Sequence, residues 1–296
     1  MSAERRSLVI GASGQVGHQI LSLLGPSRTI AAGRRVGAPD CVALDLACLP
    51  DNAEWLLEAL AIDAIYCVAG MTDVERCQSE PKLAVRVNCE GPAALAAWAA
   101  RIGVPFIYFS TEYIFNGKDG PYAEEAAGDP ICVYGKSKWL GELAVREAHP
   151  NALIVRTTVV YGPDPGEKNF LYSLRRALAA RKPFAVPCDQ ISTPTYNRDL
   201  ANAVIGLVHG RARGVFHVCG PERLSRLEFA RRAAEAMRLD PAGIIGVPTP
   251  GLGQRAPRPL SAGLSTEKLA RLRPDLKMRG VEESIRDWAA GEALPC

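Results

Sequence analysis

The sequence predicts an α/β fold in which a doubly wound, parallel sheet is covered by helices on both faces. Two patterns carry this prediction. Short apolar runs rich in β-branched residues alternate with longer segments of helical spacing through the first half of the chain, and a glycine-rich turn joins the first run to the first helical segment. With 296 residues, the chain is also long enough for a second lobe, because single domains usually have roughly 100–200 residues.

The strands expected in the first half are short and apolar, as buried parallel strands are. They cover residues 7–10, 29–32, 64–68, 106–110 and 153–158. The helices expected between them cover residues 15–24, 53–61, 81–102 and 135–147, where apolar residues recur with the helical period. The third helix is expected to be bent or uneven around Gly91 and Pro92, because proline has no amide hydrogen for the helical ladder.

The pattern changes after Tyr161. Glycine and proline cluster in residues 162–166, which marks a loop that leaves the sheet. Helices are then expected over residues 170–178, 199–208 and 225–237, a strand that returns to the main sheet over residues 214–218, and a Pro/Gly-rich loop facing a cleft over residues 248–259. We therefore expect a first domain over residues 1–160, to which residues 195–220 return, and a smaller lobe made of residues 161–194 and 221–296.

Composition excludes several classes of protein. The formal net charge is only +3, from 35 basic and 32 acidic residues, and no basic run is interleaved with aromatic residues, so nucleic acid is not an expected partner. No apolar stretch approaches the roughly 20 residues of a membrane span, and residues 1–7 lack the features of a signal peptide, so a cytoplasmic location is expected. Nine scattered cysteines without a Cys-x-x-Cys pair indicate reduced core thiols, and four histidines without ligand spacing predict no metal site.

The turn after the first expected strand has the sequence GASGQVG, residues 11–17, and opens the first expected helix. Gly11 permits the sharp turn, Gly14 lets a pyrophosphate approach the backbone, and Gly17 allows close packing of the helix on the strand. The anion then lies at a helix N-terminus, where amide groups and the helix dipole favour it. This pattern is typical of the nucleotide-binding turn of a Rossmann fold, and the predicted contacts are Gly11, Ser13, Gly14, Gln15, Val16 and Gly17.

The residues after the second expected strand indicate which dinucleotide is bound. Arg34 and Arg35 stand where an acidic residue would accept hydrogen bonds from a ribose 2′-hydroxyl. Two guanidinium groups would instead pair with a 2′-phosphate, which favours NADPH (NADP+), with NADH as the second candidate. The alternative is that both arginines are solvated surface residues. Asp45 and Leu46 are placed to meet the adenine edge.

A tyrosine and a lysine four residues apart form the candidate catalytic pair. Tyr134 and Lys138 share one face at the start of an expected helix. A nearby ammonium group favours the phenolate and lowers the tyrosine pKa, so that the phenol can exchange a proton with a carbonyl or alcohol oxygen during hydride transfer. Thr111 follows the preceding expected strand, within reach of the same substrate oxygen.

These residues belong to longer blocks that resemble the dTDP-4-dehydrorhamnose reductases. The central block comprises residues 110–117 (STEYIFNG), 122–124, 134–138 and 141–142. The resemblance extends over nearly the whole chain, in residues 69–74, 80–81, 87–88, 91–92, 156–162, 169–170, 189–190, 193–195, 199–201, 258–259, 261, 264 and 268–269. It implies a two-lobed, extended short-chain reductase that uses NADPH to reduce the 4-keto group of a deoxyhexose linked to dTDP.

The resemblance also implies roles for individual residues. Thr111, Tyr134 and Lys138 would be the catalytic set. The cofactor-binding residues near the nicotinamide would be Val68, Ala69, Gly70 and Asn88. On the substrate side, the implied residues are Thr72, Val74, Glu112, Asn169, Gln190, Thr195 and Arg258, the last because a guanidinium group suits a diphosphate.

The chain departs from the family's pattern at three positions. Glu112 and Asn116 stand where the family usually has Asp, and Val159 stands in the segment where the family commonly has a Trp that can pack against the sugar ring. The regulatory β subunits of methionine adenosyltransferase share the same blocks, so a non-catalytic NADP-binding subunit is one alternative to a reductase. A sugar-nucleotide epimerase or dehydratase on the same scaffold is another, and a homodimer is left open.

Overall fold

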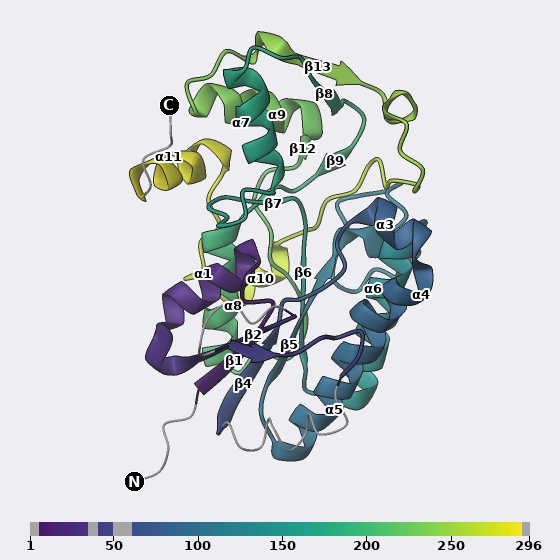
Figure 1. Cartoon of the computed structure of the whole chain (residues 1–296), viewed down its shortest axis with the longest axis vertical. Coiled ribbons are helices and arrows are strands. Elements are labelled where there is room, and N and C mark those ends of the chain that lie inside the picture. The colour runs from purple at the N-terminus through teal and green to yellow at the C-terminus, as the bar shows by residue number, and fades with distance from the viewer. Residues whose placement is uncertain (1–5, 35–40, 50–60, 292–296) are drawn as a thin grey trace.

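The centre of the molecule is a seven-stranded parallel sheet (Figure 1). The computed structural model describes residues 6–34, 41–49 and 61–291. All neighbouring strands are parallel, and their order is that of a doubly wound dinucleotide-binding fold with one strand added. From one edge to the other the strands are β3 (Cys41–Ala43), β2 (Thr29–Gly33), β1 (Arg6–Ile10), β4 (Ile62–Cys67), β5 (Phe106–Thr111), β6 (Leu153–Thr157) and β11 (Gly214–His217).

Most of the expected strands are confirmed. The five strands of the first half are present, and residues 214–217 do return to the main sheet, where β11 pairs with β6. Strand β3 was not expected, because its three residues are too few to show a pattern; it pairs with β2 at the edge of the sheet. The helix expected over residues 53–61 lies, apart from Ala61, outside the described residues.

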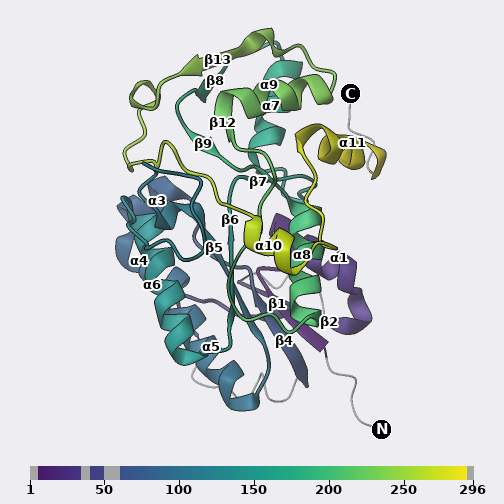
Figure 2. The ribbon, with the colours of Figure 1, turned by 180° about the vertical axis from the view of Figure 1, so that it is seen from behind.

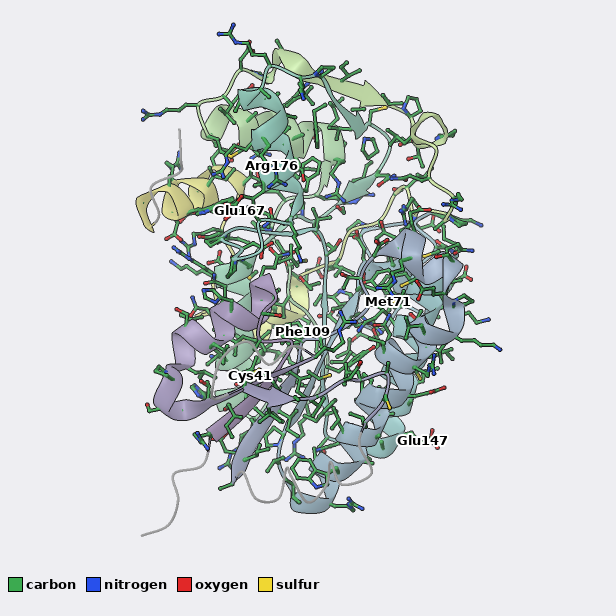
Figure 3. The ribbon with its side chains drawn as sticks, in the orientation of Figure 1. Cys41, Met71, Phe109, Glu147, Glu167 and Arg176 are labelled. Carbon is green, nitrogen blue, oxygen red and sulfur yellow. The ribbon has the colours of Figure 1, made fainter. Side chains whose placement is uncertain are left out.

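The strands contribute side chains to two cores, one on each side of the sheet, because alternate residues of a strand face opposite sides. On one side, Phe106 and Tyr108 of β5 pack with residues of α5 (Gly91–Ile102) and α6 (Val133–Ala148). On the other side, Phe109 packs with residues of α1 (Gln15–Leu24) and α8 (Asn197–His209), the helices seen over the sheet in Figure 2. Phe109 is labelled near the middle of the molecule in Figure 3.

The unevenness expected around Gly91 and Pro92 is a π-helical turn. Helix α4 (Pro81–Val85) continues into the π turn η2 (Arg86–Glu90) and then into α5, and the Gly91 amide donates to the Arg86 carbonyl five residues back. Pro92 has no amide hydrogen to donate to the Asn88 carbonyl four residues earlier. That carbonyl accepts a hydrogen bond from the Tyr108 hydroxyl of β5 at 2.5 Å instead.

The second lobe lies over the carboxyl ends of the strands (Figure 1). Its core joins α7 (Phe170–Ala179), α9 (Arg226–Ala236) and α11 (Val281–Gly291) to the parallel pair β8 (Phe184–Pro187) and β13 (Ile244–Val247). Two short strand pairs connect this lobe to the rest: β7 (Val160–Tyr161) with β10 (Thr195–Tyr196), and β9 (Ile191–Ser192) with β12 (Leu224–Ser225). Helices α3 (Val74–Ser79) and α10 (Glu267–Leu272) complete the elements used below. The domain boundaries stay a prediction.

The cysteines only partly fit the expected pattern. Eight of them lie in the described residues and none of these forms a disulfide, but only Cys67, Cys77, Cys132 and Cys219 are buried, and Cys48 is exposed. Cys296 lies outside the described residues. Among the helices that the structure describes, none combines the length and apolar character needed to cross a membrane.

Candidate functional site

The glycine turn between β1 and α1 has little room for side chains. Gly11 has φ +94°, and a Cβ added there would lie 2.7 Å from the Ala69 backbone nitrogen. A Cβ added at Gly17 would lie 2.2 Å from the Gly11 carbonyl oxygen, because α1 packs tightly against the turn. Gly14 precedes α1 and provides no side chain to cap its first amides. Amides at the start of a ten-residue helix beside a bare backbone form a cradle that fits a dinucleotide pyrophosphate.

The adenosine end of the expected cofactor site is only partly described. Arg34 is exposed just after β2, and Arg35 lies outside the described residues. The Asp45 carboxylate accepts a hydrogen bond from the Ala47 amide at 3.0 Å. Leu46 is buried, and its carbonyl lies 2.2 Å from where a Cβ on Gly91 would be. The backbone after β3 is thus held against α5.

Asn88 organises the segment expected near the nicotinamide. Its side chain accepts a hydrogen bond from the Met71 amide at 2.8 Å and donates to the Met71 carbonyl at 3.0 Å and to the Ser137 hydroxyl at 3.0 Å. Ser137 in turn donates to the Tyr134 carbonyl at 2.8 Å. Met71 is labelled beside α3 and α6 in Figure 3. The fully buried amide therefore joins the loop after β4 to the helix that carries the candidate catalytic pair.

The loop after β4 is also tied to the glycine turn. The amides of Val68 and Ala69 both donate to the Ile10 carbonyl, at 2.9 and 2.8 Å. A Cβ added at Gly70 would lie 3.1 Å from the Asn88 side-chain oxygen and 3.9 Å from the Lys138 Nζ. The loop after β4 therefore lies between the glycine turn and Lys138. A planar ring could stack on the backbone of this loop.

The structure brings Thr111, Tyr134 and Lys138 together at the carboxyl end of β5. All three are buried, with 5%, 9% and 4% of their surface exposed. The Thr111 hydroxyl is hydrogen-bonded to the Tyr134 side chain. Helix α6 starts immediately before Tyr134, and the thiol of Cys132 accepts a hydrogen bond from the Gly135 amide at 3.4 Å.

Burial controls the charges of the tyrosine and lysine. It raises the Tyr134 pKa, and the hydrogen bond from Thr111 offsets part of this effect. The lowered Tyr134 pKa expected from the sequence is therefore wrong for this structure, because desolvation of the phenolate outweighs the hydrogen bond from Thr111. Burial also lowers the Lys138 pKa to about 8.

Two residues expected on the substrate side have other partners in the structure. The Glu112 carboxylate accepts hydrogen bonds from the Thr158 hydroxyl and, at 2.9 Å, from the Gly263 amide, and only 2% of the residue is exposed. Thr195 is completely buried in β10, and its hydroxyl donates to the Thr193 carbonyl at 3.1 Å. Both side chains therefore hold backbone segments together. Neither has accessible surface for contact with a ligand.

The other substrate-side residues lie on segments of both lobes. Thr72 is exposed and Val74 half-buried at the start of α3. Asn169 caps α7 and donates to the Gln15 side chain at 3.1 Å. Gln190 donates to the Thr249 hydroxyl at 2.9 Å and to the Gln254 side chain at 3.2 Å. The hydrogen bond between Asn169 and Gln15 therefore links the two lobes through two side chains predicted to contact ligands.

Arg258 joins the loop over residues 248–259 to α3. Its Nη2 donates to Glu75 of α3 at 2.7 Å, and its Nε donates to Gln254 at 3.2 Å. Its Nη1 is buried and has no hydrogen-bond partner within the described part of the chain. One nitrogen of a guanidinium group that is held by two other partners therefore lacks an acceptor among these protein residues.

Sequence analysis missed two residues at this site. The Tyr113 ring lies edge-on to Tyr134, with 5.4 Å between the ring centroids. Arg226, the first residue of α9, places its guanidinium carbon 5.4 Å from the centroid of the Phe170 ring, and burial lowers its pKa despite the nearby Tyr113 and Glu112. No local signal in the sequence marks Arg226, because Phe170, Tyr113 and Glu112 are all more than 50 residues away along the chain.

Comparison with known proteins agrees with this architecture. Residues 5–290 match the family model described as the RmlD substrate binding domain. A dTDP-4-dehydrorhamnose reductase of Sinorhizobium fredii is 34% identical over 302 residues, which cover 96% of this chain and 97% of that protein. The spore coat polysaccharide biosynthesis protein SpsK of Bacillus subtilis is 35% identical over 237 residues, which cover 79% of this chain and 81% of that protein.

A solved structure extends the similarity to three dimensions. The dTDP-4-dehydrorhamnose reductase of Bacillus anthracis, determined in complex with NADP, has a TM-score of 0.85 at 28% identity. The comparison covers 97% of this chain and 99% of that one. The predicted fold class is thereby confirmed.

Proposed function

The chain belongs to the family of the RmlD substrate binding domain, and on that premise we propose that it is an NADPH-dependent reductase of the 4-keto group of a nucleotide-linked deoxysugar. The observation that carries this proposal is the hydrogen-bonded pair Thr111 and Tyr134, with Lys138 one helical turn away, at the sheet edge where the glycine turn also lies. A proton donor next to a dinucleotide cradle is what carbonyl reduction requires.

The cofactor site is assigned to the two backbone segments at this edge. The glycine turn would hold the pyrophosphate, and the loop over Val68, Ala69 and Gly70 would lie against the nicotinamide. NADPH, when bound, supplies the hydride. Lys138 is the residue that would bind the ribose hydroxyls, and Asn88 keeps the loop and α6 in register with each other.

Tyr134 donates the proton in this proposal. Its raised pKa keeps the phenol protonated at neutral pH, as a donor to a developing alkoxide must be. The Thr111 hydroxyl would bond the same oxygen and orient it. The reaction then leaves a secondary alcohol on the sugar and a tyrosinate that recovers its proton from solvent.

The substrate's diphosphate is assigned to Arg258. The buried Nη1 has a free donor, and guanidinium groups bind phosphate oxygens in well-defined geometry. The sugar would lie beside Tyr134, whose ring is in contact with the ring of Tyr113. A cytoplasmic location and a homodimer remain predictions; sedimentation of the purified protein would check the second.

The test is a set of nucleotide-linked 4-keto sugars, each mixed with the protein and NADPH while the absorbance of reduced nicotinamide is followed. We expect stoichiometric loss of NADPH with at least one dTDP-linked sugar. Tyr134→Phe should reduce kcat by about 10²–10⁴-fold while leaving the NADPH dissociation constant within about twofold, because it removes the proton donor and little volume. A variant that keeps most of its kcat would refute the role of Tyr134.

The alternatives give different results in the same assay. An epimerase or dehydratase would convert a sugar without net consumption of NADPH, since it regenerates its cofactor in each cycle. A regulatory subunit would bind NADPH, turn over none of the sugars and recover a stoichiometric partner enzyme in a pull-down.

A further inference from the structure

Lys138 contacts an aromatic ring rather than a carboxylate. Its Nζ lies 3.9 Å from the centroid of the Tyr108 ring. Within the residues that the structure describes, the ammonium group has no hydrogen bond or ion pair. The nearest carboxylate on its own helix, Glu142, is bound by Arg156 through Nε at 3.0 Å and Nη2 at 2.8 Å. The ring face is therefore the direct electrostatic support of a buried cation.

Two neighbours, Asn88 and Gly141, fix the Tyr108 ring in place. The residue is completely buried in β5, and its hydroxyl donates to the Asn88 carbonyl, which is available because Pro92 cannot bond it. A Cβ on Gly141 would lie 2.3 Å from the Tyr108 hydroxyl oxygen, so α6 approaches the ring as closely as a glycine allows. The ring cannot rotate away from Lys138 without breaking this packing.

We propose that Tyr108 is a positioning residue for the reaction, whose ring holds the Lys138 ammonium beside Gly70 and keeps it charged. This inference rests on the proposed function, in which Lys138 binds the cofactor ribose. Tyr108 contacts neither reacting group; it acts through the lysine. A desolvated cation–π contact favours the protonated amine and opposes the effect of burial.

Other groups around Lys138 act at longer range or face elsewhere. The charged residues of α4, η2 and α5 that flank α6 are exposed: Lys82, Arg86, Glu90 and Arg101. The short helix η3 (Glu112–Ile114) contributes Glu112, bonded to Thr158 and Gly263, and Tyr113, which contacts Tyr134. Burial lowers the Lys138 pKa, and the groups that raise it are the thiols of Cys67 of β4, Cys77 of α3 and Cys89 of η2 and the carboxylate of Glu142.

The test compares two substitutions that separate the ring from the hydroxyl. Tyr108→Leu removes the ring, and Tyr108→Phe keeps it. Tyr66→Leu is the matched control, because Tyr66 is an equally buried tyrosine of the neighbouring strand that packs on the other side of the sheet. The readouts are the titration of ¹³Cε-labelled Lys138 by NMR, assigned with Lys138→Met, and the pH dependence of NADPH binding and of kcat.

We expect Tyr108→Leu to lower the Lys138 midpoint by about one pH unit and to move the high-pH loss of NADPH binding and kcat by the same amount. Tyr108→Phe and Tyr66→Leu should leave the midpoint within about 0.3 pH unit. An unchanged midpoint in Tyr108→Leu would overturn the proposal, and so would an equal shift in Tyr108→Phe, which would assign the effect to the hydroxyl.

A fluorinated series covers the case in which Tyr108→Leu does not fold. Phenylalanine with one, two and three ring fluorines at position 108 keeps the volume while weakening the negative ring face. A stepwise fall of the Lys138 midpoint supports the proposal, and a constant midpoint overturns it. The NMR and NADPH readouts need no sugar, so a chain that reduces none of the keto sugars would refute the proposed function without changing this result.

Discussion

Glu112 offers a prediction in which stability and catalysis can be separated. The carboxylate is 2% exposed and is bonded by Thr158 of the segment after β6 and by Gly263 of the C-terminal segment. Burial raises its pKa from 4.5 to about 7, against the lowering effect of these two hydrogen bonds. Glu112→Gln keeps the shape and can keep both hydrogen bonds, and it removes the charge.

The sign and size of the effect of Glu112 on folding stability follow from proton linkage. Between pH 4.5 and about 7 the folded protein keeps the Glu112 proton while the unfolded chain has lost it, so stability falls as the pH rises. Each pH unit of this interval contributes about 1.4 kcal/mol, which gives a total loss of at most about 3 kcal/mol. Above about pH 7 both states are ionised and this group adds no further pH dependence. Glu112→Gln should remove the loss.

Urea denaturation at pH 5 and pH 8.5 measures the effect. The free energy of unfolding of Glu112→Gln should exceed that of the parent protein at pH 8.5 and lie within about 1 kcal/mol of it at pH 5. Glu90→Gln, an exposed change of the same chemistry, should keep the parent pH dependence. If Glu112→Gln keeps the parent pH slope, the reasoning from burial is refuted. If it instead raises KM for the sugar with stability unchanged, Glu112 is a substrate contact.

Three further predictions concern the cofactor site and the core. Gly17→Ala should weaken NADPH binding by at least about tenfold in calorimetry, because the new Cβ would lie 2.2 Å from a carbonyl oxygen of the glycine turn. Changing Arg34 and Arg35 to Ala should weaken NADPH about ten- to a hundredfold and leave NADH within about twofold, since only NADPH carries the 2′-phosphate. Glu142→Gln should destabilise the fold by about 3–5 kcal/mol in urea, because it leaves the buried Arg156 without its carboxylate.

Each of these predictions has a control and a contrary outcome. Gly243→Ala, whose new Cβ would meet a Leu178 methyl group at 3.2 Å in the other lobe, should not change NADPH binding. Equal losses for NADPH and NADH in the arginine variants would exclude a contact with the phosphate. Glu147→Gln, on the exposed face of the same helix, should change stability by less than about 0.5 kcal/mol, and a similar small effect for Glu142→Gln would show that Arg156 finds another partner.

The sequence by itself determined the features that depend on short-range spacing. Alternating apolar strands and helical segments predicted the sheet, because a buried parallel strand must be apolar throughout. The glycines of residues 11–17 predicted the tight turn, and the four-residue spacing of Tyr134 and Lys138 placed both on one face of α6. The uneven helix around Gly91 and Pro92 also followed, because the missing proline amide is a local property.

Only the tertiary structure decided which groups those elements meet, and therefore their charges. Tyr108 lies beneath Lys138 because β5 and α6 pack together, and Glu112 meets Gly263 although 151 residues separate them. The Tyr134 pKa is a further example. The sequence places a lysine four residues away, which was expected to lower this pKa. The folded chain buries the phenol, and desolvation of the phenolate raises the pKa instead. Spacing along a chain fixes local geometry, whereas burial and long-range partners exist only once the chain has packed.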